Sequence, residues 1–245
     1  MSRLKRHCER SVSVGKPGDR CDTFTDVTTE RFDVLTAPRP VWRGLMHSWA
    51  FAISIPAGVL LILLADHAAA RVAAAVYVGS LLAVFGTSAA YHRLAHSVRA
   101  RTIMQRLDHS MIYLLIAGTY VPICLLALPP AWGIPLLSVV GGLAVIGIVI
   151  KLVAFRKLAW LGYALYPIMG WCAVAAAPAI GTHLSPLQLT LVVAGGLAYT
   201  IGFPVLLLRR PDPWPSVFGY HEVWHGFTVL AAALHFGAVT TLVAA

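Results

Sequence analysis

Apolar stretches alternate with short polar breaks from residue 42 to the end of the chain. A helix needs about 20 apolar residues to cross a bilayer core of roughly 30 Å. Seven stretches meet this requirement: residues 43–65, 72–95, 107–128, 132–154, 158–180, 187–208 and 218–243. The pattern predicts an all-α integral membrane protein, a seven-transmembrane helix bundle.

Residues 1–40 have a different composition, with eight Lys or Arg and six Asp or Glu scattered among Gly, Pro, Ser and Thr. No apolar run in this part is long enough for a signal-peptide core. Such a mixed-charge segment buries too little apolar surface to fold alone. We therefore expect a disordered cytoplasmic leader over residues 1–40 and one transmembrane domain over residues 41–245.

Basic residues test the number of spans, because short cytoplasmic loops collect Lys and Arg. Of the 19 Lys and Arg, 18 fall in the leader or in alternate breaks that would share its side of the membrane. Only Arg71 falls on the other side. This distribution predicts a cytoplasmic N-terminus, an external C-terminus and a multi-pass protein of the plasma membrane.

Composition narrows the function classes further. Only 12% of the residues are charged and the mean hydropathy is +0.76, whereas soluble domains are about 25% charged. The net charge is +9, but so apolar a chain leaves no polar basic face that could bind nucleic acid. We therefore expect membrane lipids as partners. The four cysteines form no CxxC pair and indicate neither a disulfide framework nor a cysteine zinc site.

Ionisable groups inside membrane spans are costly and mark candidate functional sites. Ser88 and His92 lie four residues apart near the end of span two, Asp108 opens span three, and His221 and His225 repeat the four-residue spacing in span seven. All five are expected near the cytoplasmic edge. Three neutral imidazoles with an open fourth position are typical of catalytic zinc, whose bound water loses a proton near neutral pH.

This interpretation gives each side chain a role. His92, His221 and His225 would bind Zn²⁺, Asp108 would orient the water or take its proton, and Ser88 would donate a hydrogen bond to the water or to a substrate carbonyl. The alternative is a buried polar network that holds spans two, three and seven together.

Other polar residues favour plainer interpretations. Residues 221–225 match the HExxH motif of metalloproteases, but Glu222 need not face a metal and its place at the membrane edge is compatible with exposure. For His235 the sequence leaves two roles equally open: a residue behind the metal ligands that orients them, or a residue that packs between helices. Headgroup-level or hydrogen-bonding roles are expected for the remaining histidines of the spans and loops: His47, His67, His96, His109 and His183.

The combination of separated motifs resembles a known family. Ser88-xxx-His92, Leu107-Asp108-His109-Ser110 continuing into residues 116–122, and His221-xxx-His225 followed by Leu234-His235-Phe236 are similar to the hemolysin III family. That family belongs with the progestin and adiponectin receptors (PAQR) and more broadly with the alkaline ceramidases. The resemblance runs from about residue 40 to the end of the chain.

The resemblance implies a seven-helix bundle with a cytoplasmic N-terminus. It also implies zinc bound by His92, His221 and His225, with Asp108 and Ser88 close to the metal-bound water. In the receptor and ceramidase branches such a site is associated with hydrolysis of lipid amides. For the hemolysin III branch the resemblance implies the site more than the substrate: the family name reflects a cytolytic phenotype, and the other account is a role in homeostasis of membrane lipids or membrane energetics.

Three function classes follow. The first is a zinc-dependent hydrolase of lipid amides or esters. The second is a non-catalytic membrane sensor or a pore-forming, hemolysin-like protein with structural or regulatory zinc. The third is a metal or proton transporter. It ranks last because transport sites usually lie near the membrane midplane between repeats, whereas this cluster is expected at one edge of the membrane.

Overall fold

The computed structural model describes residues 39–245, which contain helices and no β-strand. The helices are α2 (Leu45–Leu64), α3 (Ala68–Leu94), α4 (Val98–Pro122), α5 (Pro130–Val153), α6 (Ala159–Trp171), α7 (Ala177–His183), α8 (Pro186–Leu208) and α9 (Tyr220–Val243). A π-helical turn, Ile123–Ala127, extends α4, and a 3₁₀ segment, Cys172–Ala176, joins α6 to α7. Within the described part of the chain these elements form seven spans long and apolar enough to cross a membrane, which confirms the predicted fold class. The predicted leader lies outside the described residues except for residues 39 and 40.

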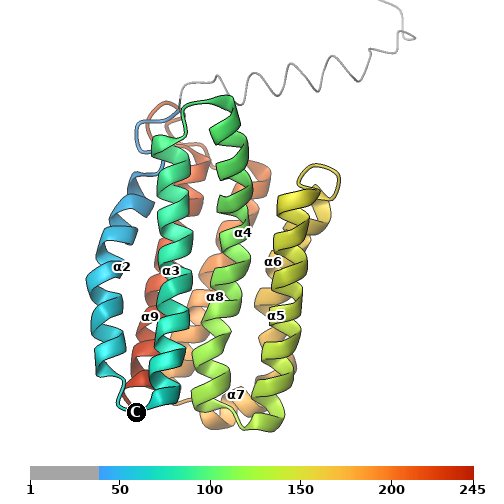
Figure 1. Ribbon diagram of the computed structural model, residues 1–245. Helices are drawn as coiled ribbons and strands as arrows, with labels where there is room; N and C mark the ends of the chain where they lie inside the picture. Colours follow the sequence, from blue (N-terminus) through green and yellow to red (C-terminus); the bar gives the residue numbers. More distant parts are fainter. Residues whose placement is uncertain (1–38) are drawn as a thin grey trace, which may run out of the picture. The chain divides into compact units, whose positions relative to one another are not determined.

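Consecutive helices pack as neighbours along most of the chain, and α9 closes the bundle by contacting α2, α3, α4 and α8. In Figure 1, α2, α3 and α9 lie together on one side, α5 and α6 on the other, and α4 and α8 between them. The start of α2 and the C-terminus lie at opposite ends of the bundle, as an odd number of spans requires. Which end faces the cytoplasm stays a prediction from the basic residues.

The third span begins earlier than expected. The hydropathy pattern places its start at residue 107, whereas α4 begins at Val98, where the Ser97 hydroxyl caps the helix by accepting from the Ala100 N–H. The added turns carry Arg99, Arg101 and Arg106, residue types that favour helix and can extend their charges toward water. Asp108 therefore lies ten residues, about 15 Å, inside the helix and does not open it.

Side chains satisfy the polar groups left free where helices meet. Arg71 Nε donates to the carbonyl of Ala65, just past the end of α2, and Arg101 Nε donates to the carbonyl of Ala95, just past α3. The final carbonyls of a helix lack partners within it, so each arginine stabilises the turn before its own helix.

The fifth span is broken rather than continuous. The Tyr120 hydroxyl of α4 donates to the Met169 carbonyl at 2.8 Å and accepts from the Ala173 N–H at 3.0 Å. These bonds replace backbone pairs that the break removes, as buried polar groups in a membrane require.

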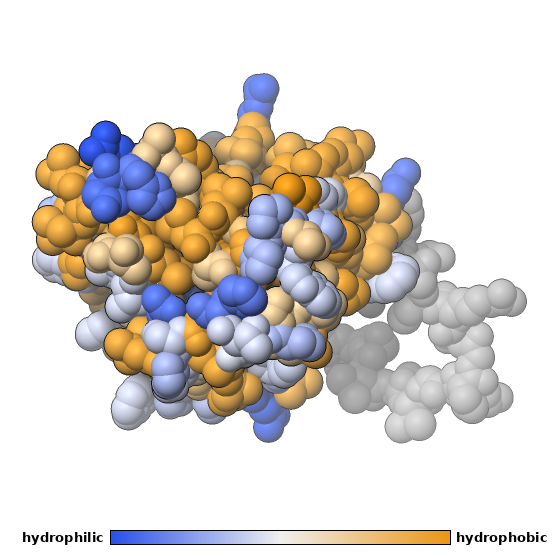
Figure 2. Space-filling model, turned by 90° about the horizontal axis from the view of Figure 1, so that it is seen from below, coloured by the Kyte–Doolittle hydropathy of each residue, from blue (hydrophilic) through white to orange (hydrophobic). Residues whose placement is uncertain are grey.

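Two groups of buried side chains form the interior. One joins α2, α3 and α9 around Tyr77, and the other joins α4, α5 and α6 around Tyr113 and Met169. Large apolar side chains also cover much of the outer surface, as expected for a lipid-facing bundle. Seen from the end that carries the C-terminus, the described surface is mainly apolar with scattered hydrophilic residues (Figure 2).

Candidate metal centre

Three histidines from two helices converge near the end of the bundle where α3 ends and α9 begins. His92 lies two residues before the end of α3, and His221 and His225 lie on the first two turns of α9. One ligand nitrogen from each ring lies within 4.8 Å of the other two. The structure thus brings together the three histidines that the sequence analysis predicts as metal ligands.

The spacing of two of these nitrogens fits a tetrahedral metal, and the third lies within 4.8 Å of both. Zinc–nitrogen bonds of about 2.0–2.1 Å place neighbouring ligands of a tetrahedral ion about 3.3 Å apart. Nε2 of His92 and Nε2 of His221 are 3.2 Å apart, and the His225 ring is inclined by 60° and 59° to the other two rings. The three histidines can therefore hold a metal ion with little movement of the first two.

A cavity of about 50 Å³ lies beside His221 and His225. By the same measure one water molecule needs about 10–15 Å³, so the cavity has room for water next to a metal. Its polar and aromatic lining comes from α2, α3, α4, α6, α8 and α9: His47, Phe85, Ser88, Asp108, His109, Tyr163, Tyr166, Tyr199, His221, Trp224, His225 and Thr228.

Asp108 and Ser88 both line this cavity, as a role in water activation requires. Asp108 is 9% exposed and Ser88 is 1% exposed. The Ser88 hydroxyl faces the Asp108 carboxyl but has no hydrogen-bond partner among the described residues. Ser88 and Asp108 therefore act on each other at the wall of the cavity.

His47 is part of the site, although the sequence offered no reason to place it there. Its ring stacks on His225 with centroids 3.7 Å apart and planes 11° apart. The Thr228 hydroxyl donates its only hydrogen to the His225 carbonyl, so at its 3.0 Å contact with His47 it accepts from Nε2–H. Nδ1 of the neutral His47 ring is then an acceptor, and this atom is buried without a partner among the described residues.

His109 also differs from its expected peripheral role. Its ring lines the cavity beside Tyr163 and packs against Phe155. The plain interpretation holds for three further histidines: His67 caps α3, His183 makes local hydrogen bonds at the end of α7, and His96 is exposed.

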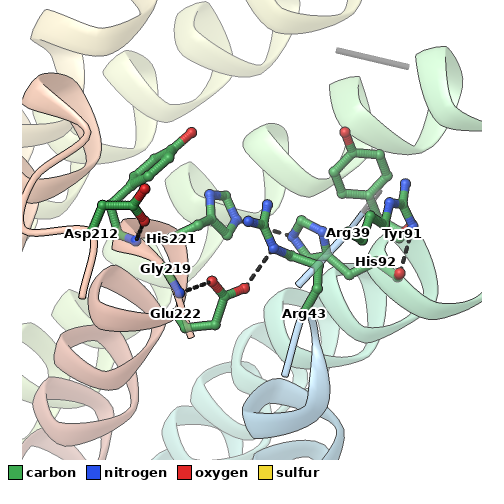
Figure 3. Close-up of polar contacts among 9 residues, drawn as sticks. Arg39, Arg43, Tyr91, His92, Asp212, Gly219, His221 and Glu222 are labelled. Atoms are coloured by element: carbon green, nitrogen blue, oxygen red, sulfur yellow. Dashed lines mark hydrogen bonds and ion pairs between the residues drawn. The ribbon is translucent and has the colours of Figure 1, made fainter. Parts of the chain in front are cut away.

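Glu222 is not exposed, and the expectation from its place at the membrane edge is wrong. Its side chain is fully buried. Oε1 accepts from Nε of Arg43 and Oε2 accepts from the Gly219 N–H (Figure 3). Both carboxylate oxygens are occupied away from the cavity, so the HExxH match lacks a free base.

His235 serves packing. Its Nε2 lies 3.1 Å from the Val192 carbonyl of α8, and a methyl group added at Gly195 would overlap the imidazole ring. His235 does not line the cavity. It therefore joins α8 to α9 and does not support the metal ligands.

Comparison with known proteins shows which family and which proteins the chain is similar to. The family model described as "Haemolysin-III related" matches residues 35–236. The chain is 30% identical over 209 residues to the "Hemolysin-3 homolog" of Bacillus subtilis, covering 84% of this chain and 95% of that protein. It is 33% identical over 199 residues to "Hemolysin-3" of Bacillus cereus, covering 80% and 88%. It is also 29% identical over 195 residues to the "Heptahelical transmembrane protein ADIPOR2" of rice, covering 72% and 84%.

Proposed function

The chain belongs to the hemolysin III family, and from that premise we propose that it is a zinc-dependent hydrolase of lipid amides or esters in the plasma membrane. The observation that carries the proposal is the group of three histidine nitrogens within 4.8 Å, set in a membrane bundle beside a cavity that Asp108 and Ser88 line. Three nitrogen ligands with an open position are the pattern of catalytic zinc.

His92, His221 and His225 would hold the metal. Bound zinc would supply a Lewis acid that activates water near neutral pH and polarises a carbonyl. The nearly buried Asp108 carboxyl would accept the proton of the attacking water and pass it to the leaving amine or alkoxide. The Ser88 hydroxyl would donate a hydrogen bond to the carbonyl oxygen as negative charge develops on it.

The setting favours a lipid as substrate. The cavity lies among spans whose outer surfaces are apolar, and its walls include Tyr163, Tyr166 and Tyr199 from α6 and α8. Aromatic and aliphatic walls suit the apolar part of a lipid, and Asp108 and Ser88 are the polar groups that would face its amide or ester.

The test is hydrolysis by purified protein in detergent or liposomes, with N-acyl amide and acyl ester lipids that release a fluorescent group. We expect activity in zinc-loaded protein, loss after chelation and recovery on adding zinc. Activity that is unchanged after the metal is removed and verified absent would overturn the proposal.

A second function rests on the name of one relative. The Bacillus cereus protein is called Hemolysin-3, which favours a pore-forming protein in which the histidine site is structural or regulatory. Release of a dye from liposomes by protein that cleaves neither lipid class would favour this function.

A further inference from the structure

Residues 39–44, which we call the clasp, precede α2 and contact both helices that carry the candidate metal ligands. Proximity along the chain does not explain these contacts, since the clasp is about 50 residues from the end of α3 and about 180 residues from the start of α9. A role of the clasp in metal affinity rests on the proposed metal site.

On the α3 side, the clasp binds the peptide group of a ligand residue. The Arg39 guanidinium donates to the carbonyls of Tyr91 and His92 and lies over the Tyr91 ring, 5.6 Å from its centroid. Carbonyls in the last turn of a helix lack partners within the helix, and a positive charge is favourable there. Arg39 therefore fixes the last turn of α3, where His92 lies.

Gly44 brings the clasp against the same histidine. Its φ of 78° is in the left-handed region, which a side chain disfavours. A Cβ atom at this position would lie 2.5 Å from Cβ of His92. Only glycine allows the chain to pass this close to His92 in this conformation.

On the α9 side, the clasp binds the loop before the helix and its first turn. The Val41 and Trp42 N–H groups donate to the carbonyls of Ser216 and Val217. Arg43 Nε donates to Oε1 of Glu222 at 2.5 Å, and Oε2 of the same carboxylate accepts from the Gly219 N–H at the start of α9 (Figure 3). Glu222 thus joins Arg43 to the turn that carries His221.

We propose that the clasp and Glu222 set the metal affinity of the site by holding the end of α3 and the start of α9 at the spacing that His92 and His221 need. Glu222 is a positioning residue that acts through Arg43 and the Gly219 N–H. It is not the base of a protease-like reaction.

The opposite charges of Arg43 and Glu222 make positioning distinguishable from a purely electrostatic effect on the metal. The Arg43 guanidinium is paired with Glu222, the residue next to His221, and a positive charge this close to the site repels a metal cation. If the pair acted through charge alone, removing Arg43 would tighten zinc binding and removing the Glu222 charge would weaken it. If the pair acts by positioning, both changes weaken binding.

The experiment compares Arg43→Gln, Glu222→Gln and the double variant, using full-length protein and zinc affinity measured by competition with a chromophoric chelator. Glutamine at 222 keeps the cap, because its side-chain oxygen still accepts from the Gly219 N–H, but it loses the ionic pair. Partners that orient metal ligands change affinity about 10- to 100-fold. We expect each variant to bind zinc about tenfold more weakly, and the double variant to be no weaker than the singles.

Arg71→Gln is the matched control, since Arg71 also donates to a carbonyl just past a helix end but at the opposite end of the bundle. Its zinc affinity should equal that of the wild type. If a single variant fails to fold because one buried charge is left alone, the uncharged double variant still tests the proposal through the same tenfold loss.

The possible outcomes separate this inference from the proposed function. Tighter zinc binding in Arg43→Gln, or wild-type affinity in the double variant, overturns the clasp and leaves the metal site standing. If the wild type binds no zinc, the proposed function and the control of metal affinity both fail. Amide exchange at residues 219–225 then shows whether the contacts still order this turn, with faster exchange expected in the double variant than in Arg71→Gln.

Discussion

Replacing Asp108 by Asn separates catalysis from metal binding. The change removes a proton acceptor that lines the cavity but alters little volume, and the three histidines come from α3 and α9, not from α4. A positioned general base contributes about 10²–10⁴ to the rate, which corresponds to about 3–5 kcal/mol at 1.36 kcal/mol per tenfold. We therefore expect hydrolysis to fall at least about 100-fold while the zinc content stays at the wild-type level.

The assay pairs initial rates on the fluorogenic lipid amide or ester with metal analysis of the same sample. Asp66→Asn is the control, because Asp66 is exposed in the loop between α2 and α3 and should leave both quantities unchanged. Hydrolysis within a few-fold of wild type in zinc-loaded Asp108→Asn would refute the role of Asp108 as base. Loss of zinc together with activity would show instead that Asp108 supports the metal.

Three further predictions concern packing, metal and topology. His235→Ala should lower the free energy of unfolding by about 1–3 kcal/mol, through a lost hydrogen bond and a cavity between α8 and α9, with the zinc content unchanged; denaturation and metal analysis check both. Zinc at about 100 times its dissociation constant should stabilise the protein by about 2.7 kcal/mol and raise its melting temperature by about 5–10 °C, and His221→Ala/His225→Ala should abolish this shift in thermal denaturation. Alkaline phosphatase fused after Ala245 should be active outside a bacterial inner membrane, and an inactive fusion would reverse the predicted orientation.

Local sequence predicted most of the fold. Each span is a nearly continuous apolar run, so hydropathy alone located the seven spans of the described residues with most boundaries within a few residues. The main error, at Val98, arose where the helix extends into a basic segment that hydropathy excludes. The break at Cys172–Ala176 was also missed, because hydropathy does not show that the Tyr120 hydroxyl of another helix accepts from the Ala173 N–H there.

The sequence predicted those site residues that are regularly spaced along a single helix. The four-residue separations of Ser88 and His92, and of His221 and His225, place each pair on one helix face. His47 has no such partner in its own helix, and only the packing of α2 on α9 brings it to His225. The burial of Glu222 likewise depends on Arg43, 179 residues away in sequence.

Elemental metal analysis of purified protein beside the His221→Ala/His225→Ala variant tests the central claim most directly. Helix content and monodispersity establish that both samples are folded, and both are prepared without chelators. The account predicts about one zinc ion per wild-type chain, as expected for one site with three nitrogen ligands, and none in the variant. A wild-type protein without metal, or equal zinc in both samples, would contradict it.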